Sequence, residues 1–252
     1  DVEAFSDQEA VIMGTTLPAV ILKTKDGGKT WKTVFEDSSK YTFLDAMDFS
    51  GDQGIVIGDP VNNRLFLAET KNGGEDWEIR RQEIFSLIEK GEAFFAASGS
   101  NIKWLPGHHY ACVSGGKKSS LYLDSAGKFL LALSQGEETT GANSIAVNPA
   151  NPNQGFVTGG DFSNDGIING NALRIRFHPF QQQKPNHPPH GYRSCVEYIS
   201  DQTLICCGTS GVDISADGGM HWKLISTKSF HVCGRPKSGR SVFLAGAHGA
   251  IA

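Results

Sequence analysis

Three strings of eight residues recur along the chain, and each stands between two apolar, strand-like runs. They occupy residues 24–31 (TKDGGKTW), 70–77 (TKNGGEDW) and 215–222 (SADGGMHW). The paired glycines favour a tight turn, because glycine adopts positive φ angles without a steric penalty. An Asp or Asn before them can accept hydrogen bonds from the turn backbone, and the closing Trp is large enough to wedge between packed sheets. We therefore predict three strand–turn–strand hairpins of one design.

The spacing of these turns indicates a repeat architecture. Asp26 and Asn72 are 46 positions apart, and a weaker copy is centred on Asp124, 52 positions further on, with Phe129 in place of the Trp. Asp217 follows Asp124 after 93 positions, which is close to two periods, so a decayed copy should lie near residue 173. A period of roughly 40–50 residues built from short strands is typical of β-propeller blades.

A short apolar run that ends in glycine recurs six times, at residues 11–14, 55–58, 111–115, 156–159, 205–208 and 242–246. These runs predict an all-β chain with six visible β-propeller blades of four antiparallel strands, in a single domain that spans residues 1–252. We place the blades at residues 1–36, 41–82, 102–134, 144–183, 192–225 and 230–252, the first and the last being incomplete. The link 83–100, with room for one helical turn, and the Pro-rich segment 177–190 are expected to be irregular.

The repeated pattern, a strand followed by Ser/Thr-x-Asp-x-Gly-x-Thr-Trp, resembles the Asp-box or BNR repeat of sialidases, sortilin-type receptors and photosystem II stability/assembly factor propellers. The blade layout is most similar to the last group and its bacterial relatives, some of which are labelled oxidoreductases. Strings at 57–60 (IGDP), 92–98 (EAFFAAS) and 191–198 (GYRSCVEY) share this resemblance. It implies a seven-bladed parent whose first blade and export signal are not in this sequence, and an extracytoplasmic location, periplasmic or secreted.

Asp-box residues lie away from the active sites of the enzymes that have them, so the resemblance implies a structural role here. The residues concerned are Asp26, Trp31, Asn72, Trp77, Asp124, Asp217 and Trp222. We expect the Asp and Asn side chains of the three clear turns to be hydrogen-bonded to the turn backbone. The three Trp side chains are expected to be largely buried.

Charge and cysteine content narrow the possible partners. Lys and Arg number 23 against 27 Asp and Glu, a net charge of −4, which argues against nucleic acid as a partner. No apolar run reaches the length of a membrane span. The five cysteines form no Cys-x-x-Cys motif, and the neighbours Cys206 and Cys207 should face opposite sides of one strand. Cys195 and Cys233 lie on innermost strands of adjacent blades, and whether they pair stays open.

The sequence predicts no metal and no cofactor. Residues His178, His187 and His190, and the pair at 108–109, lack recognised ligand spacing and stand in polar or Pro-bearing stretches. The oxidoreductase label of some relatives has no support in this chain. A Gly-x-Gly-x-x-Gly string that opens a helix and a haem Cys-x-x-Cys-His motif are both absent from the sequence.

Loops that follow the glycine-ended strands should lie on the face opposite the Gly–Gly turns, together with the links between blades. The candidate binding residues in this polar mouth are Asp59, Glu92, Asn101, Lys117, Asp161, His190, Tyr192 and Arg193. A concave mouth with such groups is a default ligand site. We expect the Arg193 guanidinium to meet a partner's carboxylate, or else to pair with one of the three acids of the mouth. Arg193→Ala should then weaken binding with little effect on the fold.

Two functions fit this mouth. The first is a non-enzymatic propeller that binds a protein or glycan partner, as a scaffold in the assembly of a larger complex. The alternative is a sialidase-like glycoside hydrolase, in which two carboxylates such as Asp59 and Asp161 would act across the mouth. A sialidase needs three arginines that grip a carboxylate, but Arg is scarce here and the Phe-Arg-Ile-Pro type of string is absent. We therefore favour the binding protein.

Overall fold

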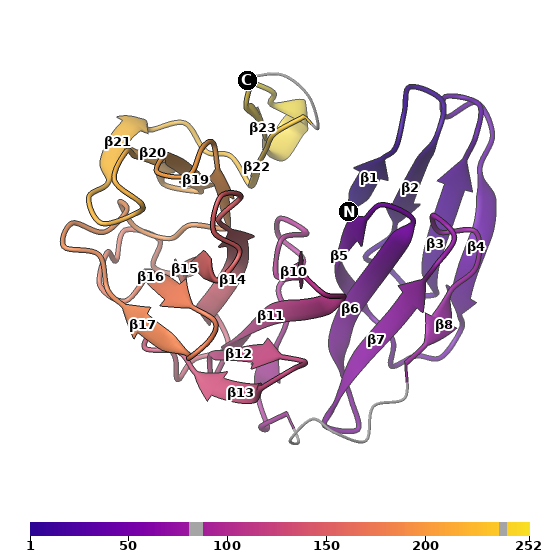
Figure 1. Ribbon diagram of the computed structural model, residues 1–252, viewed down its shortest axis with the longest axis horizontal. Helices are drawn as coiled ribbons and strands as arrows, with labels where there is room; N and C mark the ends of the chain where they lie inside the picture. The colour runs from indigo at the N-terminus through magenta and orange to yellow at the C-terminus, as the bar shows by residue number, and fades with distance from the viewer. Residues whose placement is uncertain (81–87, 237–240) are drawn as a thin grey trace. The chain divides into compact units, whose positions relative to one another are not determined.

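The computed structural model describes residues 1–80, 88–236 and 241–252. The chain divides into two compact units, unit 1 (Asp1–Lys90) and unit 2 (Gly91–Ala252), and each is described by itself. The described residues form antiparallel β-strands with one 3-10 turn, η1 (Ala247–Gly249), and no α-helix (Figure 1). The predicted all-β architecture is confirmed. The helical turn considered for the link 83–100 falls partly on residues 83–87, outside the described part.

Unit 1 consists of two four-stranded sheets in which each strand pairs with the next one along the chain. Blade 1 contains β1 (Val2–Ala4), β2 (Ala10–Met13), β3 (Ala19–Thr24) and β4 (Lys32–Asp37). Blade 2 contains β5 (Leu44–Ser50), β6 (Gln53–Val61), β7 (Arg64–Thr70) and β8 (Glu78–Ile79).

Unit 2 continues the order of strands, although the pairing of Gly115 with Gly141 joins its first two blades into one nine-stranded sheet. Blade 3 contains β10 (Ile102–Leu105), β11 (His109–Gly116), β12 (Ser120–Leu123) and β13 (Gly127–Leu130). Blade 4 contains β14 (Thr140–Val147), β15 (Gln154–Asp161), β16 (Ala172–Arg176) and β17 (Gln181–Gln183). Blade 5 contains β18 (Cys195–Tyr198), β19 (Leu204–Gly208), β20 (Gly211–Ser215) and β21 (Lys223–Ser226), and blade 6 contains β22 (Val232–Gly234) and β23 (Phe243–Ala245). A short strand, β9 (Glu92–Ala93), pairs with β11.

The strand β17 lies inside the Pro-rich segment 177–190 that we expected to be irregular. Its three glutamines pair with β16, and the four prolines stand on either side of the strand. The Gln182 amide also bonds the backbone of the neighbouring blade, accepting from the Ala132 N–H at 2.9 Å and donating to the Leu130 carbonyl at 3.1 Å. Backbone pairing and one side chain therefore order a strand that has no apolar alternation.

Within each unit, consecutive blades pack through alternate side chains of their strands, because successive residues of a strand point to opposite faces. Val196 and Cys206 belong to a core shared with Phe156 of blade 4. Cys195 precedes Val196 in the chain, and Cys207 follows Cys206. Both of these cysteines belong to a separate core with blade 6. The prediction that Cys206 and Cys207 face opposite ways is confirmed. Similar cores join blade 1 to blade 2 and blade 3 to blade 4.

The three Gly–Gly turns share one hydrogen-bond pattern. In the third turn, Asp217 Oδ1 accepts the Ser215 hydroxyl at 2.8 Å and two turn N–H groups at 3.0 Å. Burial alone would raise the pKa of Asp217, but these donors and the His221 ring outweigh it and lower the pKa to about 2. The corresponding pairs in the first two turns are Thr24–Asp26 and Thr70–Asn72.

The weaker fourth copy closes differently. Asp124 lies 3.2 Å from Nδ1 of His109, and the turn after it is closed by the Ala126 N–H, which donates to the Leu123 carbonyl at 3.1 Å. Phe129, in the position of the Trp, stacks on a ring of the next blade with centroids 4.4 Å apart. Phe129 therefore also makes an aromatic contact between blades, but with the following blade, whereas Trp222 contacts the preceding one.

The three Trp side chains differ in burial. Trp222 is 8% exposed and lies 5.2 Å from the Phe156 ring of blade 4. Trp77 is half-buried, with its ring 5.8 Å from that of Phe49. Trp31 is 38% exposed, so our expectation is wrong for this residue.

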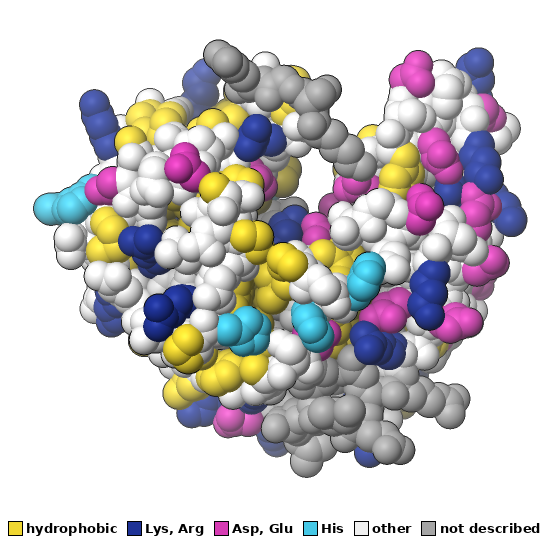
Figure 2. All heavy atoms as spheres, in the orientation of Figure 1, with side chains coloured by type: hydrophobic (Ala, Val, Ile, Leu, Met, Phe, Trp, Pro, Cys, Tyr) yellow, Lys and Arg dark blue, Asp and Glu magenta, His cyan; other side chains and the backbone are white. Residues whose placement is uncertain are grey.

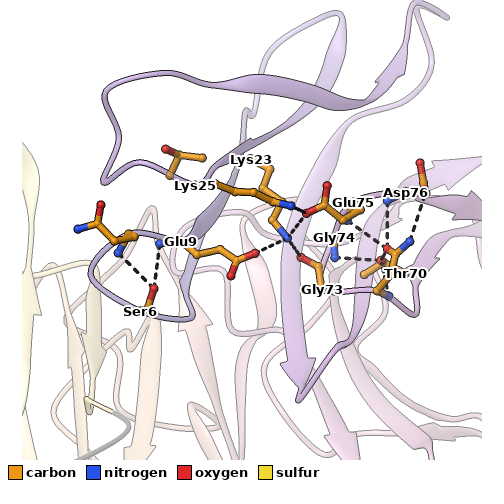
Figure 3. Close-up of polar contacts among 12 residues, drawn as sticks. Ser6, Glu9, Lys23, Lys25, Thr70, Gly73, Gly74, Glu75 and Asp76 are labelled. Atoms are coloured by element: carbon orange, nitrogen blue, oxygen red, sulfur yellow. Dashed lines mark hydrogen bonds and ion pairs between the residues drawn. The ribbon is translucent and has the colours of Figure 1, made fainter.

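A buried lysine links the two blades of unit 1 (Figure 3). The Lys23 ammonium donates to the Gly73 carbonyl at 2.7 Å and lies 2.7 Å from Glu9 and 2.8 Å from Glu75. Lys23 is 4% exposed, whereas the Lys25 side chain, which also pairs with Glu75, is 65% exposed. Burial alone would lower the pKa of Lys23, but the two carboxylates outweigh it and raise the pKa. A charged ammonium thus fastens the second Gly–Gly turn to blade 1.

We predict that Lys23→Ala lowers the free energy of unfolding by about 2 kcal/mol or more, because two carboxylates and a carbonyl lose their buried cation. Lys25→Ala should cost at most about 1 kcal/mol, since its ion pair is exposed. Urea denaturation of both variants measures the difference. Equal stability of Lys23→Ala and Lys25→Ala would show that the buried ammonium does not hold the blades together.

Candidate functional site

The eight predicted binding residues are divided between the two units. Asp59, near the end of β6, belongs to unit 1, and the other seven belong to unit 2. Five residues of the predicted mouth are buried in the structure, with Arg193 completely enclosed. These buried residues are Glu92, Asn101, Asp161, Tyr192 and Arg193. Only Lys117 and His190 are exposed among the seven in unit 2, so most of the predicted set is enclosed within the fold.

Arg193 is held by groups of its own blade. Its Nε donates to Asp213 Oδ2 at 2.8 Å, and Nη2 pairs with the same oxygen. Its Nη1 donates to the Tyr192 carbonyl and the Ser210 hydroxyl, both at 2.8 Å. Asp213 lies on β20 and is 1% exposed. The guanidinium therefore joins the segment just before β18 to the turn between β19 and β20 and to β20 itself.

Our expectation that Arg193 would meet a partner or one of three acids is wrong. A buried charge needs a partner with the same low exposure, and Asp213 on the adjacent hairpin supplies it. The acids Glu92 and Asp161 have local partners of their own. Ser114 and Lys128 donate to Glu92, the latter at 2.9 Å. The sequence did contain a sign that Asp213 is buried and paired, because it is the single carboxylate in the otherwise apolar run 211–214.

Hydrogen bonds also account for the other enclosed residues of the set. The Tyr192 hydroxyl donates to Asn143 Oδ1 at 2.8 Å, between blades 5 and 4, and burial raises the pKa of Tyr192. The Asn101 amide donates to the Phe95 carbonyl at 3.2 Å. Burial alone would raise the pKa of Glu92, but its Ser and Lys donors outweigh it and lower the pKa. These side chains connect strands, links and blades.

We predict that Arg193→Ala lowers the free energy of unfolding by about 3–5 kcal/mol, because it leaves the Asp213 carboxylate buried without a cation. Arg64→Ala, at an exposed position, should be close to wild type. Chemical denaturation of both variants tests this. Loss of partner binding by Arg193→Ala at unchanged stability would restore the original expectation of a ligand-binding arginine.

A second acid lies close to Asp59 in unit 1. Asp45 stands at a bulge in β5, is 1% exposed, and its two carboxyl oxygens have no hydrogen-bond partner among the described residues. Burial first, and the charge of Asp59 second, raise the pKa of Asp45 to about 9. The Asp45 carboxyl is therefore protonated in the folded protein at neutral pH.

This raised pKa predicts a specific pH dependence of stability. An unfolded Asp ionises near pH 4, so between about pH 4 and about pH 9 the folded state holds a proton that the unfolded state has lost. The contribution of Asp45 to the free energy of unfolding is therefore fully present below pH 4. It falls as the pH rises, by up to about 1.4 kcal/mol per pH unit. Asp45→Asn should remove this slope in urea denaturation. Asp52→Asn, at an exposed turn, is the control, and an unchanged slope in Asp45→Asn would contradict the assignment.

The loop that follows β15, residues 161–170, is tied down along its length. Asp161 accepts the Ser163 N–H at 2.9 Å and the Asn164 amide at 2.7 Å. Asp165 accepts the Thr209 hydroxyl at 2.6 Å, and its carbonyl accepts the Tyr192 N–H at 2.8 Å. The far end is held by Ser134, which donates from its N–H and its hydroxyl to two loop carbonyls. Hydrogen bonds to neighbouring segments therefore hold the loop at its start, middle and end.

This tied loop carries exposed apolar side chains. Phe162, Ile167 and Ile168 are 45%, 47% and 49% exposed, respectively. The Phe162 ring lies 5.8 Å from that of Phe95 and 6.2 Å from that of Tyr192, so it is the outer member of an aromatic row. We call Phe162, Ile167 and Ile168 the loop patch. We did not predict this patch, although the sequence contains a signal for it, the pair Ile167-Ile168 between Gly and Asn in a polar loop.

The described cavities lie elsewhere. One of about 620 Å³ in unit 1 is lined by the segment 37–42, by the hairpin of β6 and β7, and by Ile79 of β8. On the face drawn in Figure 2, Lys and Arg side chains are intermingled with Asp and Glu over the surface of β1–β8. Within residues 1–80, 88–236 and 241–252, no group of three or more His, Cys, Asp or Glu is arranged to hold a metal ion. In the same residues, no helix has the length and apolar character of a membrane span.

Comparison with known proteins supports the fold. Residues 1–84 match the family described as photosynthesis system II assembly factor YCF48. A solved structure of YCF48 bound to D1 peptide matches with a TM-score of 0.51 and 14% identity, over 100% of this chain and 89% of that one. No curated protein matches the chain.

Two glycoside hydrolases also share the architecture. The GH74 enzyme of Niastella koreensis matches with a TM-score of 0.60 and 13% identity, over 94% of this chain and 43% of that one. The GH74 xyloglucanase of Xanthomonas campestris matches with a TM-score of 0.56 and 13% identity, over 97% of this chain and 42% of that one. This chain thus spans less than half of each enzyme. At these identities the likeness shows the fold, and the chain is a BNR-type β-propeller that resembles the photosystem II assembly factor YCF48.

Proposed function

We propose that the protein is a non-enzymatic propeller that binds a segment of a protein partner at the loop patch, in the assembly of a larger complex. The observation that carries the proposal is the exposure of Phe162, Ile167 and Ile168 on a loop held by hydrogen bonds along its length. Exposed apolar side chains gathered on one loop are a feature of interaction surfaces. A loop held in place before binding loses less entropy on binding, which favours affinity.

The chemistry of the patch favours a peptide over a sugar. Aliphatic side chains such as Ile167 and Ile168 suit apolar side chains of a protein segment, whereas sugars present mainly hydroxyl groups. That a similar propeller, YCF48, has been solved with a bound peptide supports the same class of ligand here. An extracytoplasmic location, which rests on the family resemblance, belongs to the same proposal. A glycan partner is the alternative.

Glycoside hydrolysis is the less favoured function, because Asp161 is poorly suited to act as its acid. A catalytic acid needs a raised pKa in order to hold its proton at neutral pH. Burial alone would raise the pKa of Asp161, but hydrogen bonds from Asn164, Thr139 and Ser163 outweigh it and lower the pKa. The carboxylate organises the loop.

The test is capture of partners from an extract of the native source by the immobilised full chain. We predict that Ile168→Ser reduces the captured partner by about tenfold, which corresponds to about 1.4 kcal/mol for a buried apolar contact. Phe162→Ser should reduce it at least as much, because the ring is larger. Quantitative mass spectrometry measures the amount of partner that each variant captures, relative to wild type.

Ile225→Ser and Leu130→Ser serve as matched controls, since these residues are 53% and 52% exposed on other elements of unit 2. Both should capture the partner as well as wild type does. Equal capture by all four variants, each shown to be folded by its melting temperature, would contradict the proposal. Release of reducing sugar from a β-glucan by the purified protein would instead favour the hydrolase.

A further inference from the structure

Three thiols meet in the core between blades 5 and 6. Cys195 opens β18, Cys207 lies directly opposite it on β19, and Cys233 is the central residue of β22. The three are at most 3% exposed and belong to one cluster of buried residues. All five cysteines are present as free thiols in the structure.

Cys195 is the centre of this group. Its thiol donates to the Cys233 carbonyl at 3.2 Å, and the Ser100 hydroxyl donates to its sulfur at 3.7 Å. Cys233 in turn donates its S–H, at 3.9 Å, to the carbonyl of Ile205 on β19, the strand that pairs with β18. The Cys195 side chain therefore already points toward the central residue of β22 in blade 6.

The thiols also differ in acidity. Hydrogen bonds from the Cys207 and Cys233 thiols hold the pKa of Cys195 well below its usual range. The pKa of Cys233 is raised well above the usual range by its hydrogen bonds with Cys195 and Cys207, and by burial. Both shifts arise from contacts among the three thiols in the folded core.

We propose that Cys195 and Cys233 form a disulfide that fastens blade 6 to blade 5 when the chain folds in the presence of a low-molecular-weight disulfide. The Cys195 thiolate attacks one sulfur of oxidised glutathione, which forms a mixed disulfide and releases one glutathione thiolate. The Cys233 thiolate then attacks the Cys195 sulfur and releases the second glutathione. The two thiol protons pass to the two glutathione molecules, which carry away the two electrons.

Cys233 is a better partner for Cys195 than Cys207 is. Strands β18 and β19 are already joined by a continuous antiparallel ladder, so a bond from Cys195 to Cys207 would add little constraint. Blade 6 is a two-stranded sheet, and a bond to Cys233 would close a longer loop of chain, which restricts the unfolded state more. The reaction must occur before β22 is packed, because the finished core excludes the oxidant.

The experiment is refolding of the full chain from urea in a buffer of reduced and oxidised glutathione. Free thiols are then alkylated, and the protein is digested with trypsin and a Glu-specific protease. Trypsin leaves Cys195, Cys206 and Cys207 in one peptide and Cys233 in another, while cleavage after Glu197 separates Cys195 from the other two. The expected product is a cross-link between the Cys195 and Cys233 peptides, with Cys206 and Cys207 alkylated.

The oxidised protein should melt at least about 5 °C higher than the same protein after reduction. Cys112→Ser, which changes a buried thiol of blade 3, should still form the cross-link, whereas Cys233→Ala should not. The presence or absence of the Cys195–Cys233 cross-link in the wild-type digest tests the proposal even if a variant fails to fold. A bond between Cys195 and Cys207, or five alkylated cysteines after refolding, would overturn the proposal.

Discussion

The packing of one blade against the next is the interaction on which the structure depends. A strand whose residues alternate between two faces can bury both of them only if a sheet lies on each side. Cys206 and Cys207 illustrate this, because one lies in the core with blade 4 and the other in the core with blade 6. Each buried apolar side chain contributes about 1.5–3 kcal/mol, so a blade depends on its neighbours for much of its stability. The aromatic contact of Trp222 with Phe156 extends the same packing to the outer part of the blades.

This packing also decides what the polar residues can do. A charge that is enclosed between sheets must find a close partner, because the cost of desolvation exceeds the benefit of a loose contact. Lys23 meets Glu9 of its own blade and Glu75 of the next blade, and Arg193 meets Asp213 within one blade. Such groups join strands and blades and are withdrawn from solvent. The loop patch, by contrast, keeps its apolar side chains exposed on a loop that polar neighbours hold in place.

Most of the fold was predictable because its signals are local. A Gly–Gly turn after Asp or Asn has a preferred geometry, and its recurrence after 46 residues reveals the blade length without any structural information. The strand β17 was missed because three glutamines carry no alternation, and their pairing with β16 is visible only in the sheet. The exposure of Trp31 was missed for a related reason, since burial of a side chain depends on the blade beside it.

The sequence by itself determined the class of fold, the blade period, the turn chemistry of Asp26, Asn72 and Asp217, and the opposite orientation of adjacent cysteines. All of these follow from residues that are close in the chain. Only the tertiary structure decided that Arg193 pairs with Asp213, that Asp45 keeps its proton, and that Cys195, Cys207 and Cys233 meet. These contacts join residues from different strands, and their choice depends on burial and on the distance between charges, which the order of residues does not contain.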